Sequence, residues 1–172
     1  MSDPLSVQER LHLYCTAQKR AIQVPALGEG TDGGVFRTDM KTAVKVFHRQ
    51  RTYETERDCY RVLQEHNITD ICGFTVPWMR EFSDSLMVIE MSIVEPPCVL
   101  DFGKAYLHEN PPYDDEQMAE WLETQKRVWK SHWPTIRKIL SQLQSLGIFQ
   151  PDPSPRNIIA SWDPPLSIDD DD

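Results

Sequence analysis

Four of the seven glycines in this 172-residue chain fall within seven positions, at Gly28, Gly30, Gly33 and Gly34. With Val35, three of them fit the pattern G-x-G-x-x-G-x-V and lie between two predicted strands. Such a hairpin can serve as a flap that covers phosphate groups. Because a strand and not a helix follows the glycines, a dinucleotide-binding turn fits poorly, and no GKS or GKT follows as in a P-loop. A plain glycine-rich turn is the alternative.

A single lysine, Lys45, lies within the apolar run of residues 42–47. A lone lysine on a strand usually extends to solvent. The next predicted helix, over residues 52–66 with Thr52 as its N-cap, places Glu56 on an otherwise apolar face. Two opposite charges about 4 Å apart interact by roughly 4 kcal/mol at an effective dielectric near 20, enough to direct the ammonium toward anionic phosphates. The alternative leaves Glu56 in water at the edge of that face.

Two further motifs follow in the second half of the chain. Asp152 and Asn157 have the spacing D-x-x-x-x-N, just after a long predicted helix that stops at Gly147. Residues 166–168 read as a short apolar strand that ends at Asp169. Taken alone, an acidic terminus is typical of a solvated tail.

In this order the residues resemble the signature of the protein-kinase-like superfamily, over residues 22–169. That signature runs from a glycine flap through an Ala-x-Lys strand, a helix glutamate and a hinge strand to a D-x-x-x-x-N loop and a metal-binding aspartate. The resemblance implies an α+β fold, with a small antiparallel sheet and one helix in the N-lobe and a reduced, mostly helical C-lobe. It also implies that the chain binds ATP and Mg²⁺.

The resemblance further assigns the residues that would bind the nucleotide and the metal. Ile89 would line the back of the pocket, while Glu90 and Ser92 would offer a backbone carbonyl and an N–H to adenine. Asn157 and Asp169 would hold the metal, with Asp170 as the alternative to Asp169. The full set expected to bind ATP is Gly28, Gly30, Gly33, Val35, Ala43, Lys45, Ile89, Glu90 and Ser92.

The catalytic roles come from the same resemblance. Asp152 would accept the proton of the attacking hydroxyl, Lys45 would contact the phosphates, and Glu56 would hold Lys45 in place. Position 154 is a serine where many protein kinases have lysine, and Arg156 could supply the missing positive charge.

The chain also departs from the family pattern. The triplet 101–103 reads Asp-Phe-Gly, but it precedes the catalytic-loop match and falls in a predicted helix, so we assign it no role. No Phe-Gly follows Asp169, and the match stops before any activation segment. The helices that usually support the catalytic loop would have to be replaced by the N-terminal helix, by the tryptophan-rich pair at 115–146, or by another chain.

The sequence pattern predicts three parts: an N-terminal helix (1–21), an N-lobe (22–95) and a reduced C-lobe (96–172). Beyond the glycine hairpin we expect strands near 74–78 and 85–92 and a short helix over 99–107. A long helical element should run from Asp114 or Asp115 to Gly147, and Pro134 should kink it or split it in two. A strand pair at 158–161 and 166–168 should follow.

Composition narrows the classes of function. The residues are 40% hydrophobic and 26% charged, with no apolar run near the roughly 20 residues that a membrane span needs. A net charge of −9 without a basic stripe argues against nucleic acid as a partner. The start has no signal-peptide pattern, and the four scattered cysteines suggest neither disulfides nor zinc, so we expect a cytoplasmic protein.

Three functions stay open. In the first, the chain is a phosphotransferase that moves the γ-phosphate of ATP to a hydroxyl on a small molecule or a protein. In the second, it is a nucleotide-binding pseudokinase or regulatory interaction module without turnover. In the third, it is a domain with no nucleotide site. A protein partner or a second copy of the chain could complete the reduced C-lobe.

Overall fold

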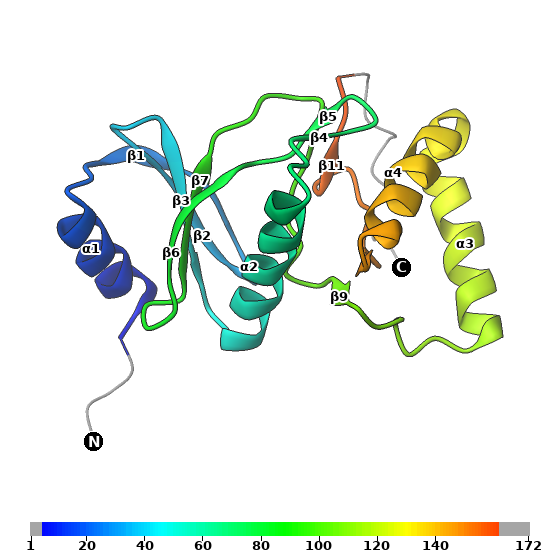
Figure 1. Ribbon diagram of the computed structural model, residues 1–172, viewed down its shortest axis with the longest axis horizontal. Coiled ribbons are helices and arrows are strands. Elements are labelled where there is room, and N and C mark those ends of the chain that lie inside the picture. Colours follow the sequence, from blue (N-terminus) through cyan, green and yellow to red (C-terminus); the bar gives the residue numbers. More distant parts are fainter. Residues whose placement is uncertain (1–4, 162–172) are drawn as a thin grey trace, which may run out of the picture.

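The computed structural model describes residues 5–161, and their architecture is α+β, as predicted (Figure 1). A five-stranded antiparallel sheet has the order β1-β2-β3-β7-β6. Its strands are β1 (Ile22–Gly30), β2 (Gly33–Thr38), β3 (Thr42–Phe47), β6 (Met79–Ser83) and β7 (Val88–Ser92). A small sheet followed by a mostly helical region is the arrangement that the resemblance to the protein-kinase-like superfamily implies.

Two helices cover the opposite faces of this sheet (Figure 1). α1 (Val7–Gln18) begins with a capping box in which Ser6 and Glu9 satisfy each other's backbone N–H groups. The guanidinium of Arg10, on α1, donates to the carbonyl oxygens of Phe47 and Leu86, so the helix is tied to the sheet by more than apolar contact. The other face packs against α2 (Gln50–Glu65).

The start of α2 differs from the prediction. Thr52 is not the N-cap: it lies inside the helix with 9% of its surface exposed, and the helix begins two residues earlier, at Gln50. Arg49 occupies the N-cap position, and its side chain makes no capping hydrogen bond. The first backbone N–H groups of α2 therefore lack a side-chain cap.

The second region is built from two helices and short strands. α3 (Asp115–Trp129) is capped by Asp114. The 3₁₀ turn η1 (Lys130–His132) separates it from α4 (Trp133–Ser145). Pro134 therefore lies in the first turn of a second helix, and the predicted split of the long helical element is confirmed. The short strands are β4 (Asp70–Ile71), β5 (Phe74–Thr75), β8 (Cys98–Val99) and β11 (Ile158–Ile159) in one sheet, and β9 (Tyr106–Leu107) with β10 (Ile148–Phe149) in another.

The helix predicted over 99–107 is wrong. This segment is extended at both ends, where β8 pairs with β11 and β9 pairs with β10. Between them Asp101 has a φ of 59°, which is incompatible with a right-handed helix. Pairing with strands some 40 to 60 positions later in the chain overrides the local pattern, since strand partners far apart in sequence leave no local signature.

Other strand boundaries were partly right. The strand expected over 85–92 begins only at Val88, because Met87 takes a positive φ of 50° in the turn after β6. The strand expected at 158–161 forms as β11, but its partner is β8. The second strand of that pair, 166–168, and both Asp169 and Asp170 lie outside the described residues.

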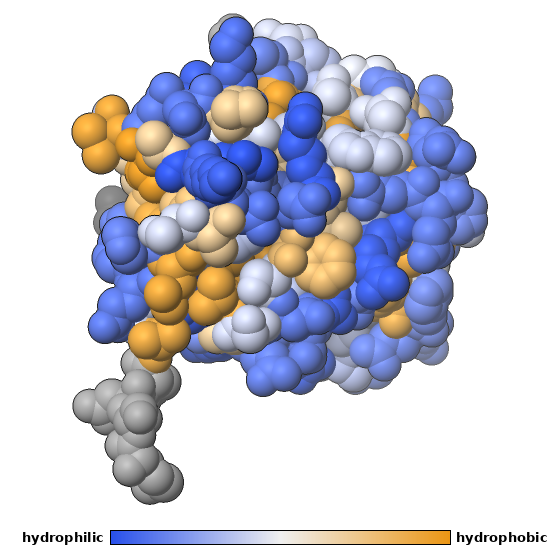
Figure 2. All heavy atoms as spheres, turned by 60° about the vertical axis from the view of Figure 1, so that its left-hand side comes forward, coloured by the Kyte–Doolittle hydropathy of each residue, from blue (hydrophilic) through white to orange (hydrophobic). Residues whose placement is uncertain are grey.

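One hydrophobic core runs from the inner face of the five-stranded sheet through α2 to α4, and a smaller one lies between α1 and the outer face. The three-part division of the chain stays a prediction. On the α1 side, hydrophobic surface occurs in limited areas among hydrophilic residues (Figure 2); Leu5 and Leu13 are each 46% exposed. Within the described residues, no helix combines the length and apolar character needed to cross a bilayer.

Candidate functional site

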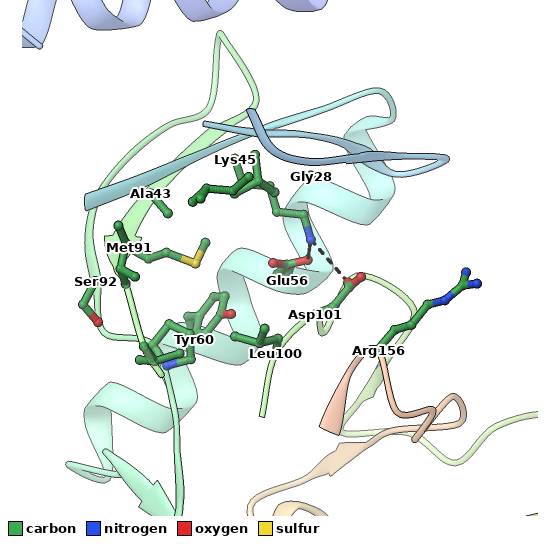
Figure 3. A pocket seen from close by; sticks show the side chains of 15 residues that line it. Gly28, Ala43, Lys45, Glu56, Tyr60, Met91, Ser92, Leu100, Asp101 and Arg156 are labelled. Carbon is green, nitrogen blue, oxygen red and sulfur yellow. Dashed lines mark hydrogen bonds and ion pairs between the residues drawn. The ribbon is translucent and has the colours of Figure 1, made fainter. Parts of the chain in front are cut away.

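A cavity of about 290 Å³ lies between the five-stranded sheet, α2 and the segment that follows β7. Its volume is at the lower end of the range for small-molecule sites. Most of its lining is apolar, with a few ionisable groups at one end (Figure 3). The lining residues are Leu27, Gly28, Val35, Ala43, Lys45, Glu56, Tyr60, Pro77, Met91, Ser92, Ile93, Val94, Leu100, Asp101 and Arg156.

Lys45 and Glu56 meet at that end of the cavity. Lys45 lies in the middle of β3, opposite Val35 on β2 and Ile89 on β7, on the sheet face that α2 covers. Its ammonium Nζ is 2.7 Å from Oε2 of Glu56, and the two residues are 8% and 1% exposed (Figure 3). The predicted ion pair is therefore present, and the alternative in which Glu56 lies in water is wrong.

Asp101 joins this pair, with Oδ1 at 3.3 Å from Nζ of Lys45. The same oxygen accepts a hydrogen bond from the N–H of Gly103, and the Asp101 carbonyl accepts one from the Gln150 side chain. Sequence reasoning assigned Asp101 no role because it expected a helix here. The signal was present in the run Asp-Phe-Gly: a small flexible residue two positions after an aspartate suits a turn that the carboxylate stabilises.

The three ionisable groups shift one another's pKa. Burial raises the pKa of Glu56 to about 7, although the Lys45 ammonium opposes this. Burial alone would lower the pKa of Lys45, but the two nearby carboxylates raise it above its ordinary value. Burial likewise works to raise the pKa of Asp101, but the Lys45 ammonium and hydrogen bonds from the Gly103 N–H and from Glu56 together bring that pKa below its ordinary value. At neutral pH, Lys45 is a cation, Asp101 is an anion, and Glu56 titrates.

The glycine hairpin contributes only part of its predicted residues to the cavity. Gly28 and Val35 line it, and Ala43 lies beneath them on β3, whereas Gly30 and Gly33 do not line it. Gly33 is needed for packing: its φ is +153°, and a Cβ there would lie 2.0 Å from the carbonyl oxygen of Val46. No neighbour lies within 4 Å of a Cβ at Gly30.

The predicted adenine contacts need correction. Glu90 is paired within the sheet to Val44 on one side and Glu81 on the other, so its carbonyl is not at the cavity. The N–H of Ser92 donates to the carbonyl of Trp78, although Ser92 does line the cavity. Both backbone groups belong to the sheet because β7 extends as far as Ser92.

β7 ends at Ser92, and the next two residues, Ile93 and Val94, also line the cavity. Ile89 is fully buried on the same sheet face as Met91 but does not line the cavity; Met91 and Tyr60 do.

The Asp152–Asn157 loop is fixed by its own hydrogen bonds. Nδ2 of Asn157 donates to the Asp152 carbonyl at 2.8 Å, and the Asn157 carbonyl accepts from the N–H of Leu100, a cavity residue. Indole N–H groups of Trp121 and Trp129 bond the carbonyls of Pro151 and Pro153, so the tryptophans position the loop.

The side chains of this loop are distributed between two cavities. The side chain of Asp152 lines a neighbouring cavity and not the one that contains Lys45. Arg156 lines the cavity of Lys45, and its guanidinium lies beyond Asp101 and points away from the ammonium (Figure 3).

The metal ligands expected from the sequence, Asn157 and Asp169, stay a prediction. Because the amide nitrogen of Asn157 is committed to Asp152, its oxygen is left for another partner, which suits a hard cation. Asp169, the second expected ligand, lies outside the described residues. Within residues 5–161, no group of three or more His, Cys, Asp or Glu side chains is arranged to hold a metal ion.

No protein-family model and no curated protein matches the chain. Among solved structures, it is similar to the streptomycin-ATP-APH(2")-IIa ternary complex, at 17% identity and a TM-score of 0.42, and to the gentamicin-APH(2")-IIa complex, at 13% and 0.40. The matches cover 82% and 84% of this chain. They cover only 41% and 56% of those chains, so this protein spans less than two thirds of either.

Proposed function

We propose that this chain is a cytoplasmic kinase-like protein that binds ATP and transfers its γ-phosphate to a hydroxyl acceptor. The observation that carries the proposal is the position of the Lys45 ammonium. It is buried, it is held at 2.7 Å by Glu56, and it lies at the ionisable end of an apolar cavity that the glycine hairpin covers. The four unpaired cysteines suit a reducing compartment.

The apolar part of the cavity suits a planar base, with Ala43 and Met91 on the sheet side and Leu27 and Val35 on the hairpin. The ammonium has three hydrogen-bond donors, and Glu56 and Asp101 take two of them. The third is available to a phosphate oxygen. Glu56 and Asp101 thus orient Lys45, and Lys45 is the group that would contact the nucleotide.

In the transfer step, the acceptor oxygen forms a bond to the γ-phosphorus while the bond from that phosphorus to the β,γ-bridging oxygen breaks, and ADP leaves. The hydroxyl proton passes to the carboxylate of Asp152. That carboxylate makes no hydrogen bond within residues 5–161, so it is available as an acceptor. Mg²⁺, when bound, would neutralise charge on the phosphates, and Asn157 and Asp169 remain its proposed ligands.

A nucleotide-binding regulator without turnover is the second candidate, in which a protein partner or a second copy completes the helical region. The observation that favours it is that Asp152 lines the adjacent cavity and not the one with Lys45. In that case the bound nucleotide stabilises one shape of the chain.

Turnover separates the two candidates. ADP release from Mg-ATP, in the presence of hydroxyl acceptors of both the small-molecule and the protein kind, is measured for the wild type, for Asp152→Asn and for Asp115→Asn, a matched control at an exposed position at the start of α3. A phosphotransferase releases ADP, and Asp152→Asn reduces the rate by about 100-fold or more while Asp115→Asn does not. Binding of Mg-ATP without ADP release in the wild type contradicts the enzyme and supports the regulator.

A further inference from the structure

A second cavity, of about 570 Å³, adjoins the first. It lies between the first turns of α2, the segment that leads into β9, and Asp152. Unlike the first cavity it is mainly polar, with two cations, two threonines, two tyrosines and one carboxylate. Its lining residues are Arg51, Thr52, Thr55, Gly103, Lys104, Ala105, Tyr106, Tyr113, Pro151 and Asp152.

Gly103 lies in the lining of the second cavity, close to a residue of the first. A Cβ at this position would lie 2.5 Å from Cγ2 of Thr52, in the second cavity, and 3.2 Å from Oε2 of Glu56, in the first. Glycine is therefore required where the segment passes α2. Because Glu56 holds Lys45, the second cavity lies beside the phosphate end of the proposed nucleotide site and not beside its base end.

One side of the second cavity offers several groups to an anion. Arg51 is exposed and makes no ion pair with another described residue, and Lys104 has only a distant contact, 3.9 Å, with Asp32 at the tip of the glycine hairpin. The first N–H groups of α2 have no side-chain cap. Thr52 is 9% exposed, and its hydroxyl has no hydrogen-bond partner in the part of the chain that the structure describes. In a chain of net charge −9, such a concentration of donors favours an anionic ligand.

Asp152, from the segment after β10, also lines this cavity, and its carboxylate is half-buried and unpartnered within residues 5–161. A ligand in the cavity would thus meet both cations with helix N–H groups and a proton acceptor. Tyr106 and Tyr113 also line the cavity, with rings and hydroxyls suited to the faces and edges of a sugar.

From this arrangement we infer that the second cavity is the acceptor site, and that the acceptor is a phosphorylated hydroxyl compound of the sugar phosphate class. Its phosphate binds at the start of α2 with Arg51, Lys104 and Thr52, and its free hydroxyl faces Asp152. The inference rests on the proposed phosphotransferase function. The hydroxyl oxygen gains the γ-phosphoryl group of ATP, its proton goes to Asp152, and ADP is the leaving group.

Inorganic phosphate tests the anion end without any need for turnover. It is titrated into Lys45→Met protein, in which the ammonium of the nucleotide site is absent, and binding is followed by calorimetry. We expect saturable binding that weakens about tenfold or more in the double variant Arg51→Gln with Lys104→Gln, because two charged hydrogen-bond donors to the phosphate are lost. Arg127→Gln removes one positive charge from the exposed face of α3 and leaves the phosphate affinity unchanged.

Equal phosphate affinity in the double variant and in Arg127→Gln, or no saturable binding, overturns the inference. Arg51, Lys104 and Arg127 are exposed, so their substitutions are expected to leave the fold intact, and a melting temperature unchanged from that of Lys45→Met checks this. The result is independent of nucleotide binding, so a failure of the anion site is distinguishable from a failure of the nucleotide site.

Turnover tests the acceptor class. ADP release by the wild-type protein is measured with glucose 6-phosphate, ribose 5-phosphate and glycerol 3-phosphate, each against its unphosphorylated counterpart. At least one phosphorylated compound should stimulate release well above its counterpart, and the double variant should raise its KM by about tenfold with a smaller effect on the KM for ATP. Equal stimulation by both members of every pair, or none by any, overturns the assignment.

Discussion

The two faces of the five-stranded sheet each bury one carboxylate, and the two carboxylates differ in their hydrogen bonds. On the outer face Glu90 is 0% exposed and accepts from three donors: Tyr14 and Arg20 at 2.9 Å and Thr42 at 2.6 Å. On the inner face Glu56 is 1% exposed, and it accepts a hydrogen bond from the ammonium of Lys45.

Their pKa values shift in opposite directions for that reason. Burial works to raise the pKa of Glu90, but hydrogen bonds from Thr42, Arg20 and Tyr14 lower it below its ordinary value. Burial raises the pKa of Glu56 to about 7. A buried carboxylate with a full set of donors fixes α1 to the sheet, whereas one that shares a cation beside a cavity leaves that cation with a free donor for a ligand.

The largest expected effect concerns stability on the outer face. Glu90→Ala leaves Arg20, Tyr14 and Thr42 without their acceptor and should reduce the free energy of unfolding by about 3–5 kcal/mol. Glu56→Gln keeps an acceptor for Lys45 and should cost about 1 kcal/mol near pH 4.5, where Glu56 is protonated in the folded state. Urea unfolding measures both.

If Glu90→Ala does not fold, Arg20→Gln serves instead, since Arg20 is partly exposed and its loss leaves Glu90 buried with two donors. A larger loss of stability in Glu56→Gln than in both outer-face variants would contradict the comparison.

The next effect is the dependence of stability on pH. The folded pKa of Glu56, about 7, lies above its ordinary value of 4.5, so the folded state binds more protons than the unfolded state between these two values. Glu56 therefore lowers the free energy of unfolding as pH rises from 4.5 to 7, by up to about 3 kcal/mol at 1.36 kcal/mol per pKa unit. Glu56→Gln removes this contribution.

As the pH rises from 4.5 to 7, Glu56→Gln should therefore become more stable relative to the wild type, and above pH 7 the difference in unfolding free energy should stay constant. For Glu90 the sign is opposite: its folded pKa is lowered, so it stabilises above its ordinary value and the stabilisation disappears as pH falls through the folded value. Parallel pH profiles for wild type and Glu56→Gln between pH 4.5 and 7 would show that Glu56 does not titrate there.

The smallest effect concerns Asp101. Asp101→Asn keeps an oxygen for the N–H of Gly103 and for Lys45 but removes a negative charge beside the proposed phosphate position. ADP without Mg²⁺ should bind about two- to fivefold tighter, as expected for one partly screened like charge. Calorimetric titration measures the change, with Asp84→Asn as a control, because this carboxylate accepts from Tyr53 and Arg57 and does not line the cavity. Weaker binding of metal-free ADP would contradict this reading of Asp101.

The sequence predicted the contact on the inner face of the sheet, between Lys45 and Glu56, better than the backbone contacts at the end of β7, and the reason is physical. Lys45 and Glu56 lie on consecutive elements whose local periodicity defines which side chains share a face. The errors at Glu90 and Ser92 arose because the end of a strand depends on its pairing with β3 and β6, which local pattern does not specify.

Two other features depend on long-range contacts. Asp101 was missed because β8 and β9 pair with strands much later in the chain. The position of Asp152 depends on hydrogen bonds from Trp121 and Trp129, on a helix about 30 residues earlier.

The Mg-ATP-induced rise in melting temperature, compared between wild type and Lys45→Met, tests the central claim most directly. Lys126→Met, at an exposed position on α3, is the control for the loss of a lysine. The wild type and the control should show the same rise at saturating Mg-ATP, and Lys45→Met should show none. An equal rise in all three proteins would contradict the claim that the ammonium held by Glu56 binds the nucleotide.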